Sequence, residues 1–333
     1  GTEKIGAYAF SEATALSEIT FPSTLTSFGE GAFLATGFSS FTIPDTVREV
    51  GSNLLAGCTA LTSLTLGRGL SVTPAGICRE ATALSSVTIP DGYTAIGQSS
   101  SYGCTALASL RLPDSVGEIG SAAFYGCTKL TDVSAEKLTA IGTEAFRGAT
   151  ALENFRLPAT LRTVGVQAFY GCKVWKDPDL SHLTSVGKQA FYGCDGIRTA
   201  DITGLGSYLA EGVFAACESL TEIRFPENLT VIGYGAFTNC TALKSVTFPK
   251  HLRTIGGSAF VGCVSLSSIG WNDGLTTIGD SAFAYAYSLR ELKLPDGVKT
   301  IEGKAFQNSE SLLTVTLPDS VETVGNAAFS DCP

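Results

Sequence analysis

Ile119-Gly120-Ser121-Ala122-Ala123-Phe124-Tyr125-Gly126-Cys127 is the clearest copy of a phrase that returns along the whole chain. Each copy has an Ile or Val, usually a Gly, two variable residues, Ala-Phe, and often a Cys three residues after the Phe. Copies follow at intervals of 22 or 23 residues, and we call the place of the Phe the marker position. The fifteen marker residues are Phe10, Phe33, Leu55, Cys78, Ser101, Phe124, Phe146, Phe169, Phe191, Phe214, Phe237, Phe260, Phe283, Phe306 and Phe329.

A repeat of this length predicts a solenoid. One unit is too short to bury a hydrophobic face alone, so units stack and only the stack has a core. We therefore predict a single solenoid domain over residues 1–333, with about fifteen repeats. Apolar residues make up 44% of the chain but never form the run of about 18 that crosses a bilayer, so no membrane insertion is expected.

The repeating unit reads L-x-x-[VI]-x-[LIF]-P-x-x-[LV]-x-x-[IV]-G-x-x-A-F-x-x-C. In residues 245–248 polar and apolar side chains alternate, which is typical of a half-buried strand. Pro249 then ends the strand because proline has no N–H for pairing. Stacked strands predict one long parallel sheet. The Gly of Ile-Gly is expected to allow a tight or left-handed turn, and the segment up to the Cys to form a turn or a single helical turn.

The ten cysteines follow the same register. A residue locked to one place in a repeat is expected in the core, where a free thiol packs as a small hydrophobe and can donate to a backbone carbonyl. The alternative is a disulfide between stacked neighbours such as Cys194 and Cys217. Cys78 occupies a marker position, and nine lie three residues after one: Cys58, Cys104, Cys127, Cys172, Cys194, Cys217, Cys240, Cys263 and Cys332.

This unit resembles the BspA-like (Treponema-type) leucine-rich repeat, and the resemblance covers practically the whole chain. It implies an α/β repeat solenoid, right-handed and curved, with a long parallel sheet on the concave face and turns or short helical turns on the convex side. Members are usually secreted or displayed on cell surfaces, where they act in adhesion, and as a rule they are not enzymes. The conserved positions are structural, so no functional motif transfers.

The repeat is least regular in residues 73–78, 98–102 and 173–206, where curvature or a site could depart from the average. Neither end of the sequence resembles the polar cap that closes a solenoid. We therefore expect a piece of a longer chain.

Residues eight and ten after the marker should point outward from the predicted sheet. Charge concentrates there in the middle of the chain, which makes these residues the candidate partner-binding patch. The alternative is a solvated face whose opposite charges pair with one another across strands. The spacing of the acidic residues also raises calcium as a remote possibility. The patch consists of Arg156, Asp177, Asp179, Asp201, Glu222 and Arg224.

Other residue classes point to no definite chemistry. The net charge of −9 argues against a nucleic-acid partner. The two histidines, His182 and His251, lie three repeats apart, too far to share a proton or a metal ion. Threonines at matching positions of several repeats suggest an ice-binding surface, but only as a remote possibility. Four tyrosines that each follow a marker residue could form a ladder for glycan or protein contact, or could cover the edge of the core: Tyr102, Tyr125, Tyr170 and Tyr192.

We therefore expect a non-catalytic, extracellular or cell-surface scaffold that needs no cofactor or metal. Its expected partner is a host, matrix or assembly protein, and possibly a glycan, bound on the concave sheet. The alternative is a structural module inside a larger assembly, with no exchangeable ligand.

Overall fold

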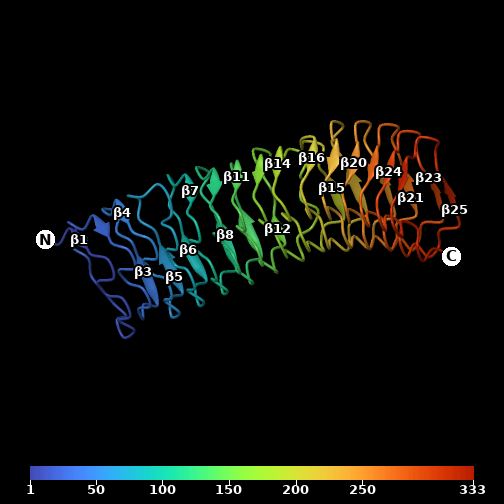
Figure 1. Cartoon of the computed structure of the whole chain (residues 1–333). Helices are drawn as coiled ribbons and strands as arrows, with labels where there is room; N and C mark the ends of the chain where they lie inside the picture. The colour runs from blue at the N-terminus through green and yellow to red at the C-terminus, as the bar shows by residue number, and fades with distance from the viewer. The chain divides into compact units, whose positions relative to one another are not determined.

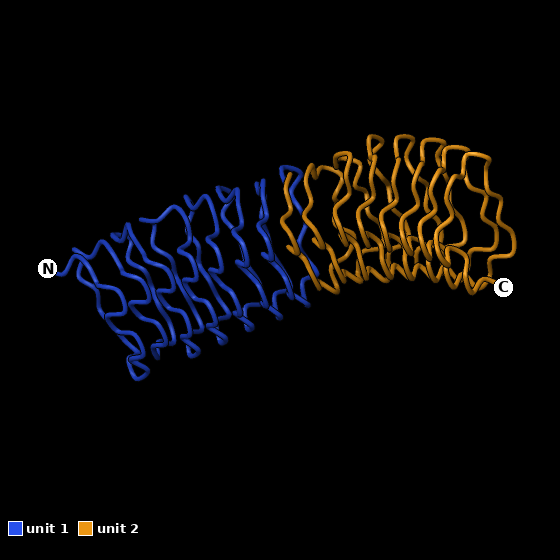
Figure 2. The backbone as a smooth tube through the Cα atoms, viewed as in Figure 1, with its two compact units in different colours: residues 1–161 blue, residues 162–333 orange.

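The computed structural model describes all 333 residues and consists of short parallel strands joined by turns (Figure 1). It contains no helix, and so none that is long and apolar enough to cross a membrane. Two compact units, residues 1–161 and 162–333, are described separately below (Figure 2). That the whole chain is one continuous domain stays a prediction.

Each repeat of unit 1 contributes up to two strands. The strand before the proline position belongs to what we call the first column, and the strand that ends in Ile or Val before the Gly belongs to the second column. The first column comprises β3 (Ser40–Thr42), β5 (Ser63–Thr65), β6 (Ser86–Thr88), β8 (Ser109–Arg111), β10 (Asp132–Ser134) and β12 (Asn154–Phe155). The second column comprises β1 (Lys4–Ile5), β2 (Ser27–Phe28), β4 (Glu49–Val50), β7 (Ala95–Ile96), β9 (Glu118–Ile119) and β11 (Ala140–Ile141).

Unit 2 has the same two columns. The first comprises β15 (Thr199–Asp201), β17 (Glu222–Arg224), β19 (Ser245–Thr247), β21 (Ser268–Gly270), β23 (Glu291–Lys293) and β25 (Thr314–Thr316). The second comprises β13 (Thr163–Val164), β14 (Ser185–Val186), β16 (Tyr208–Leu209), β18 (Val231–Ile232), β20 (Thr254–Ile255), β22 (Thr277–Ile278), β24 (Thr300–Ile301) and β26 (Thr323–Val324).

Most of the predicted strands are present, although residues 177–179 form none, and the single long sheet is wrong. The first column is divided into short sheets, β3-β5-β6 and β8-β10-β12 in unit 1 and β15-β17, β19-β21 and β23-β25 in unit 2. The second column was not predicted. It forms because the N–H of the Gly after each strand must be paired: Gly256 donates to the Ile232 carbonyl at 2.8 Å, which holds β18 and β20 side by side.

The segment around each marker residue forms turns, so of the two predicted alternatives the turn is confirmed and the helical turn is wrong, and the architecture is all-β rather than α/β. Residues two before and two after the marker are left-handed, as in Ala122 (φ 52°) and Gly126 (φ 68°), and this alternation interrupts a right-handed helix. The backbone N–H groups also alternate between an acceptor in the same repeat and an acceptor in the next repeat. Cys127 closes a turn onto the Phe124 carbonyl at 3.2 Å, whereas Phe124 donates to Ala145 of the next repeat at 2.8 Å.

The Gly of Ile-Gly is not left-handed, which corrects the expected reason for its presence. Its role is to let neighbouring backbones approach closely. A Cβ atom on Gly187 would lie 2.4 Å from the Val166 nitrogen, and one on Gly120 would lie 2.8 Å from the Gln98 nitrogen. Real Cβ contacts are not this short, so only glycine fits.

Marker phenylalanines form the centre of the core in each unit. In unit 2, Phe237 is fully buried and stacks on Phe214 and Phe260, with ring centroids 5.8 and 5.1 Å apart. Trp175 is also buried, and its ring centroid lies 4.3 Å from that of Phe169. The core is therefore a column of aromatic rings with aliphatic residues around it.

The cysteine ladder is confirmed: none of the ten cysteines forms a disulfide, and all but the half-buried Cys332 are buried. Most of their S–H groups donate to carbonyls of the preceding repeat, as from Cys194 to Phe169 at 3.1 Å and from Cys217 to Phe191 at 3.1 Å. Cys78 donates instead to the Ser100 carbonyl of the following repeat at 3.1 Å. Burial raises the pKa of Cys217 and of Cys263 to about 12. Thiolate, the reactive form, is therefore scarce at neutral pH.

We accordingly expect only Cys332 to react with Ellman's reagent in the native chain without reductant. After unfolding in guanidinium chloride, all ten thiols should react. Cys332→Ser should remove the native reaction and leave nine thiols in the unfolded chain. Fewer than ten thiols in the unfolded parent chain would show that the cysteines form disulfides.

Candidate partner-binding surface

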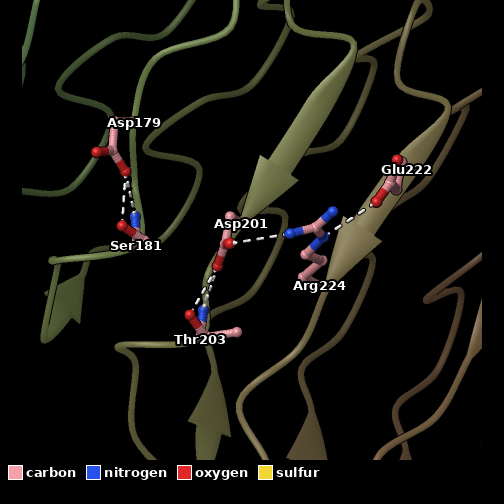
Figure 3. Close-up of polar contacts among 6 residues, drawn as sticks. All are labelled: Asp179, Ser181, Asp201, Thr203, Glu222 and Arg224. Carbon is pink, nitrogen blue, oxygen red and sulfur yellow. Dashed lines mark hydrogen bonds and ion pairs between the residues drawn. The ribbon is translucent and has the colours of Figure 1, made fainter.

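The six residues of the patch do not all occupy the predicted strand positions. Glu222 and Arg224 lie on β17 and Asp201 ends β15 (Figure 3). Arg156 follows β12 and belongs to unit 1, whereas the other five belong to unit 2. Residues 177–179 form no strand, so the expectation that Asp177 and Asp179 share one strand face is wrong.

Charges on β15 and β17 pair with one another (Figure 3). The Arg224 Nε lies 3.1 Å from Glu222 Oε1, and its Nη1 lies 3.9 Å from Asp201 Oδ2. The Arg224 side chain nonetheless remains 67% exposed, and that of Glu222 remains 55% exposed. Because exposed pairs contribute only about 0–1 kcal/mol, a partner could exchange these ion pairs for its own at little cost.

Asp179 and Asp201 also have a local structural role. Twelve residues after the marker, where other repeats have prolines such as Pro226, their repeats have Ser181 and Thr203. Unlike proline, these residues have an N–H that needs an acceptor. Ser181 donates its N–H and hydroxyl to Asp179 Oδ1 at 3.0 and 2.7 Å, and Thr203 donates likewise to Asp201 Oδ1 at 3.2 and 2.7 Å.

These hydrogen bonds, the one from the Ser181 hydroxyl first, lower the pKa of Asp179. Because the pKa is lowered in the folded state, the ionised carboxylate stabilises the fold at pH values above the ordinary pKa of Asp. This stabilisation is lost as the pH falls through the lowered pKa. Asp179 therefore stays ionised at neutral pH, with one of its oxygens already occupied.

Asp177 connects two repeats. Its Oδ1 accepts the backbone N–H of Arg198 at 2.7 Å and of Thr199 at 3.2 Å, and its φ is 36°. The carboxylate thus satisfies the backbone at the start of β15, in place of the missing strand in its own repeat. Asp177 and Asp179 face different partners, and the structure has no group of three or more His, Cys, Asp or Glu residues able to hold a metal ion.

On β15 and β17, the patch surrounds a shallow open hollow lined by Thr199, Ala200, Asp201, Glu222 and Arg224. Its walls are charged side chains on strands, and its floor is the strand at Ala200, whose own side chain is buried in the core. Such a hollow can form hydrogen bonds and ion pairs with a partner. It is open to water.

The tyrosines form stacked pairs and not an open ladder. Tyr102 and Tyr125 lie 4.6 Å apart with an interplanar angle of 8°, and the guanidinium of Arg79 lies 4.6 Å from the Tyr102 ring. Tyr170 and Tyr192 lie 4.5 Å apart at 3°. A glycan needs a free ring face to stack on, and within each pair the facing ring surfaces cover one another. This geometry favours the interpretation that the tyrosines cover the core.

Sequence reasoning missed a second hollow, in unit 1. It lies over β3, β5 and β6 and is lined by Thr42, Ile43, Pro44, Asp45, Thr65, Leu66, Arg68, Thr88 and Pro90. A neighbouring hollow shares Thr88 and adds Val87, Ile89, Asp91, Arg111 and Pro113. The available signal was the loss of Phe at three successive marker positions, Leu55, Cys78 and Ser101, the last two of which lie in irregular stretches.

Comparison with known families and structures places these features in a wider context. A model of the BspA-type leucine-rich repeat region, six copies long, matches residues 1–107, 73–198 and 207–333. No curated protein matches the chain.

Several solved structures are similar. A leucine-rich repeat protein from Bacteroides ovatus is 26% identical, with a TM-score of 0.71 over 94% of this chain and 76% of that one. A leucine-rich repeat protein from Eubacterium ventriosum is 21% identical, with a TM-score of 0.54 over 99% of this chain and 80% of that one. A leucine-rich cell surface protein from Faecalibacterium prausnitzii is 23% identical, with a TM-score of 0.51 over 86% and 82%. The last two resemble this chain in fold.

Proposed function

The chain belongs to the BspA-type leucine-rich repeat family, whose members are generally protein-interaction scaffolds, and we propose that it binds a protein partner without catalysing a reaction. The partner is a host, matrix or assembly protein, and the chain acts outside the cell or at its surface. Contact is made by the outward side chains of the first column, with the patch on β15 and β17, the first two strands of that column in unit 2.

The observation that supports this proposal most strongly is the exposed Arg224, held between Glu222 and Asp201 on paired strands. Rigid strands fix the side chains in advance, so little conformational freedom is lost when a partner binds. Arginine is also among the residues that contribute most to protein interfaces. The free thiols are compatible with an extracellular location because burial protects them from oxidants.

A protein and glycan array tests this proposal. The chain should capture at least one matrix or serum protein, and Glu222→Gln with Arg224→Gln should weaken that binding at least tenfold, because hydrogen bonds to charged groups contribute about 1.5–3 kcal/mol each. Asp201→Asn keeps an acceptor for Thr203 and tests the third charge separately.

The chain offers a matched control at the same repeat positions. Glu291 and Lys293 on β23 occupy the places of Glu222 and Arg224 relative to the marker, so Glu291→Gln with Lys293→Gln removes the same charges elsewhere. This variant should retain full binding. Equal losses in both variants would mean that the patch is not the contact, and capture of nothing by the array would favour the structural-module alternative.

A further inference from the structure

The core of unit 1 is incompletely filled beneath β6. Two successive marker positions hold Cys78 and Ser101 in place of Phe, and a small internal cavity lined by these residues and by Val87 and Ile89 lies there. Val87 occupies the central core position of its strand but is half-buried, whereas Leu64 and Leu110 in β5 and β8 are 1% and 3% exposed. Val87 is therefore partly open to solvent.

The first column is interrupted at the same place. β6 pairs with β5, but β6 and β8 belong to separate sheets. The two hollows that meet at Thr88 lie on either side of this strand. Together they form a continuous depression over β3, β5, β6 and β8, which we call the Thr88 groove. Its floor contains Val87 and Ile89, and its walls contain the hydroxyls of Thr42, Thr65 and Thr88.

The Thr88 groove carries two unpaired positive charges. Neither the Arg68 nor the Arg111 guanidinium has an ion pair or a hydrogen bond, in contrast to Arg224 in unit 2. Two carboxylates lie in the same groove, Asp45 and Asp91, and the Oδ1 of Asp45 already accepts the backbone N–H of Arg68 at 2.8 Å. The Asp91 carboxylate likewise has no hydrogen bond or ion pair, so a ligand meets two guanidinium groups and one carboxylate, and the guanidinium groups favour a ligand with carboxylates.

We propose that the Thr88 groove binds an extended acidic peptide segment in which an apolar residue lies between two carboxylates. The apolar side chain packs on Val87 and Ile89, the carboxylates pair with Arg68 and Arg111, and the threonine hydroxyls bond the peptide backbone. Arg68 and Arg111 lie two repeats apart, about 10 Å along the stack by strand spacing. Arg68 also lies three positions further along its repeat than Arg111 does, so an extended peptide must cross the strands obliquely to reach both guanidinium groups. This inference rests on the proposed protein-binding function and names a second contact and its chemistry.

The test is fluorescence anisotropy of a labelled peptide that carries Leu-Phe between two Glu residues, with the full chain as titrant. The peptide should bind saturably, and the version with Gln in place of both Glu residues should bind at least tenfold more weakly. The double variant Arg68→Gln, Arg111→Gln should also lose at least tenfold. Both arginines are exposed and unpaired, so this variant should keep the melting temperature of the parent chain.

Lys293→Gln provides the matched control because Lys293 occupies the position of Arg111 relative to its marker but lies outside the groove. It should bind the peptide normally. Unchanged binding by the arginine double variant, or equal binding of the Gln peptide, would overturn the proposal. So would arginine-dependent binding of hyaluronan, an acidic polysaccharide, without binding of the peptide.

The result of the peptide test can be distinguished from the result of the test of the proposed function. Glu222→Gln with Arg224→Gln should leave peptide binding to the Thr88 groove unchanged. Peptide binding that depends on Arg68 and Arg111 would support the groove even if the β15 and β17 patch captured no protein. Protein capture that depends on Arg224, with no peptide binding, would reject the groove alone.

Discussion

Phe237→Ala is expected to lower the free energy of unfolding by about 3–5 kcal/mol, the largest effect of any single substitution considered for this chain. The Phe237 side chain is 0% exposed and lies between the rings of Phe214 and Phe260, with Phe225 packed edge-on at 5.8 Å. Truncation removes the burial of the ring and leaves a cavity that neighbouring repeats cannot close. Chemical denaturation followed by circular dichroism measures the loss.

Leu313→Ala is the control because that side chain is 73% exposed in unit 2. It should change the free energy of unfolding by no more than about 0.5 kcal/mol. A loss below about 1 kcal/mol for Phe237→Ala would contradict the account of the core as a stacked ring column. Since repeat proteins can unfold in stages, the transition should be followed by far-UV signal and by tryptophan fluorescence together.

Gly187→Ala is expected to destabilise the chain by about 2–3 kcal/mol, although it adds a single methyl group. The added Cβ would lie 2.4 Å from the Val166 nitrogen and 2.6 Å from the Gly165 carbonyl carbon, both backbone atoms of the preceding repeat. Backbone atoms cannot rotate away as a side chain can, so β13 and β14 would be forced apart. Thermal unfolding should show a clear fall in the melting temperature.

Gly206→Ala is a matched control in the same unit. A Cβ there would meet nothing within 4 Å, and Gly206 does not have a left-handed φ. This variant should be neutral or slightly stabilising because alanine restricts the unfolded chain more than glycine does. Equal behaviour of the two variants would show that close backbone approach is not the reason for the Gly at position 187.

The sequence was sufficient to predict the features that recur in every repeat. The strand around Val246, the termination near Pro249 and the buried thiol of Cys240 each follow from a pattern repeated many times. The second column escaped prediction because its strands are only two residues long, as in β20, and alternation cannot be recognised over two residues. The left-handed residues escaped it because the positions are variable, including Ala122 and Gln167.

The candidate patch was predicted less well because its residues lie where the repeat is irregular. Register placed Asp201, Glu222 and Arg224 together, and the structure does bring them together. Register also placed Asp177 on a strand that is absent, because residues 173–180 depart from the pattern that makes the other strands. The use of Asp179 to accept the N–H of Ser181 depends on three-dimensional contacts that spacing alone does not reveal.

Photo-cross-linking to a captured partner tests the central claim, binding through the outward face of the first column, most directly. A photoreactive phenylalanine analogue is placed either at Glu222 on β17 or at Asn239, an exposed residue in the turns that follow a marker phenylalanine. The account predicts cross-links from position 222 and none from position 239. Cross-links from position 239 alone would place the partner on the turns and contradict it.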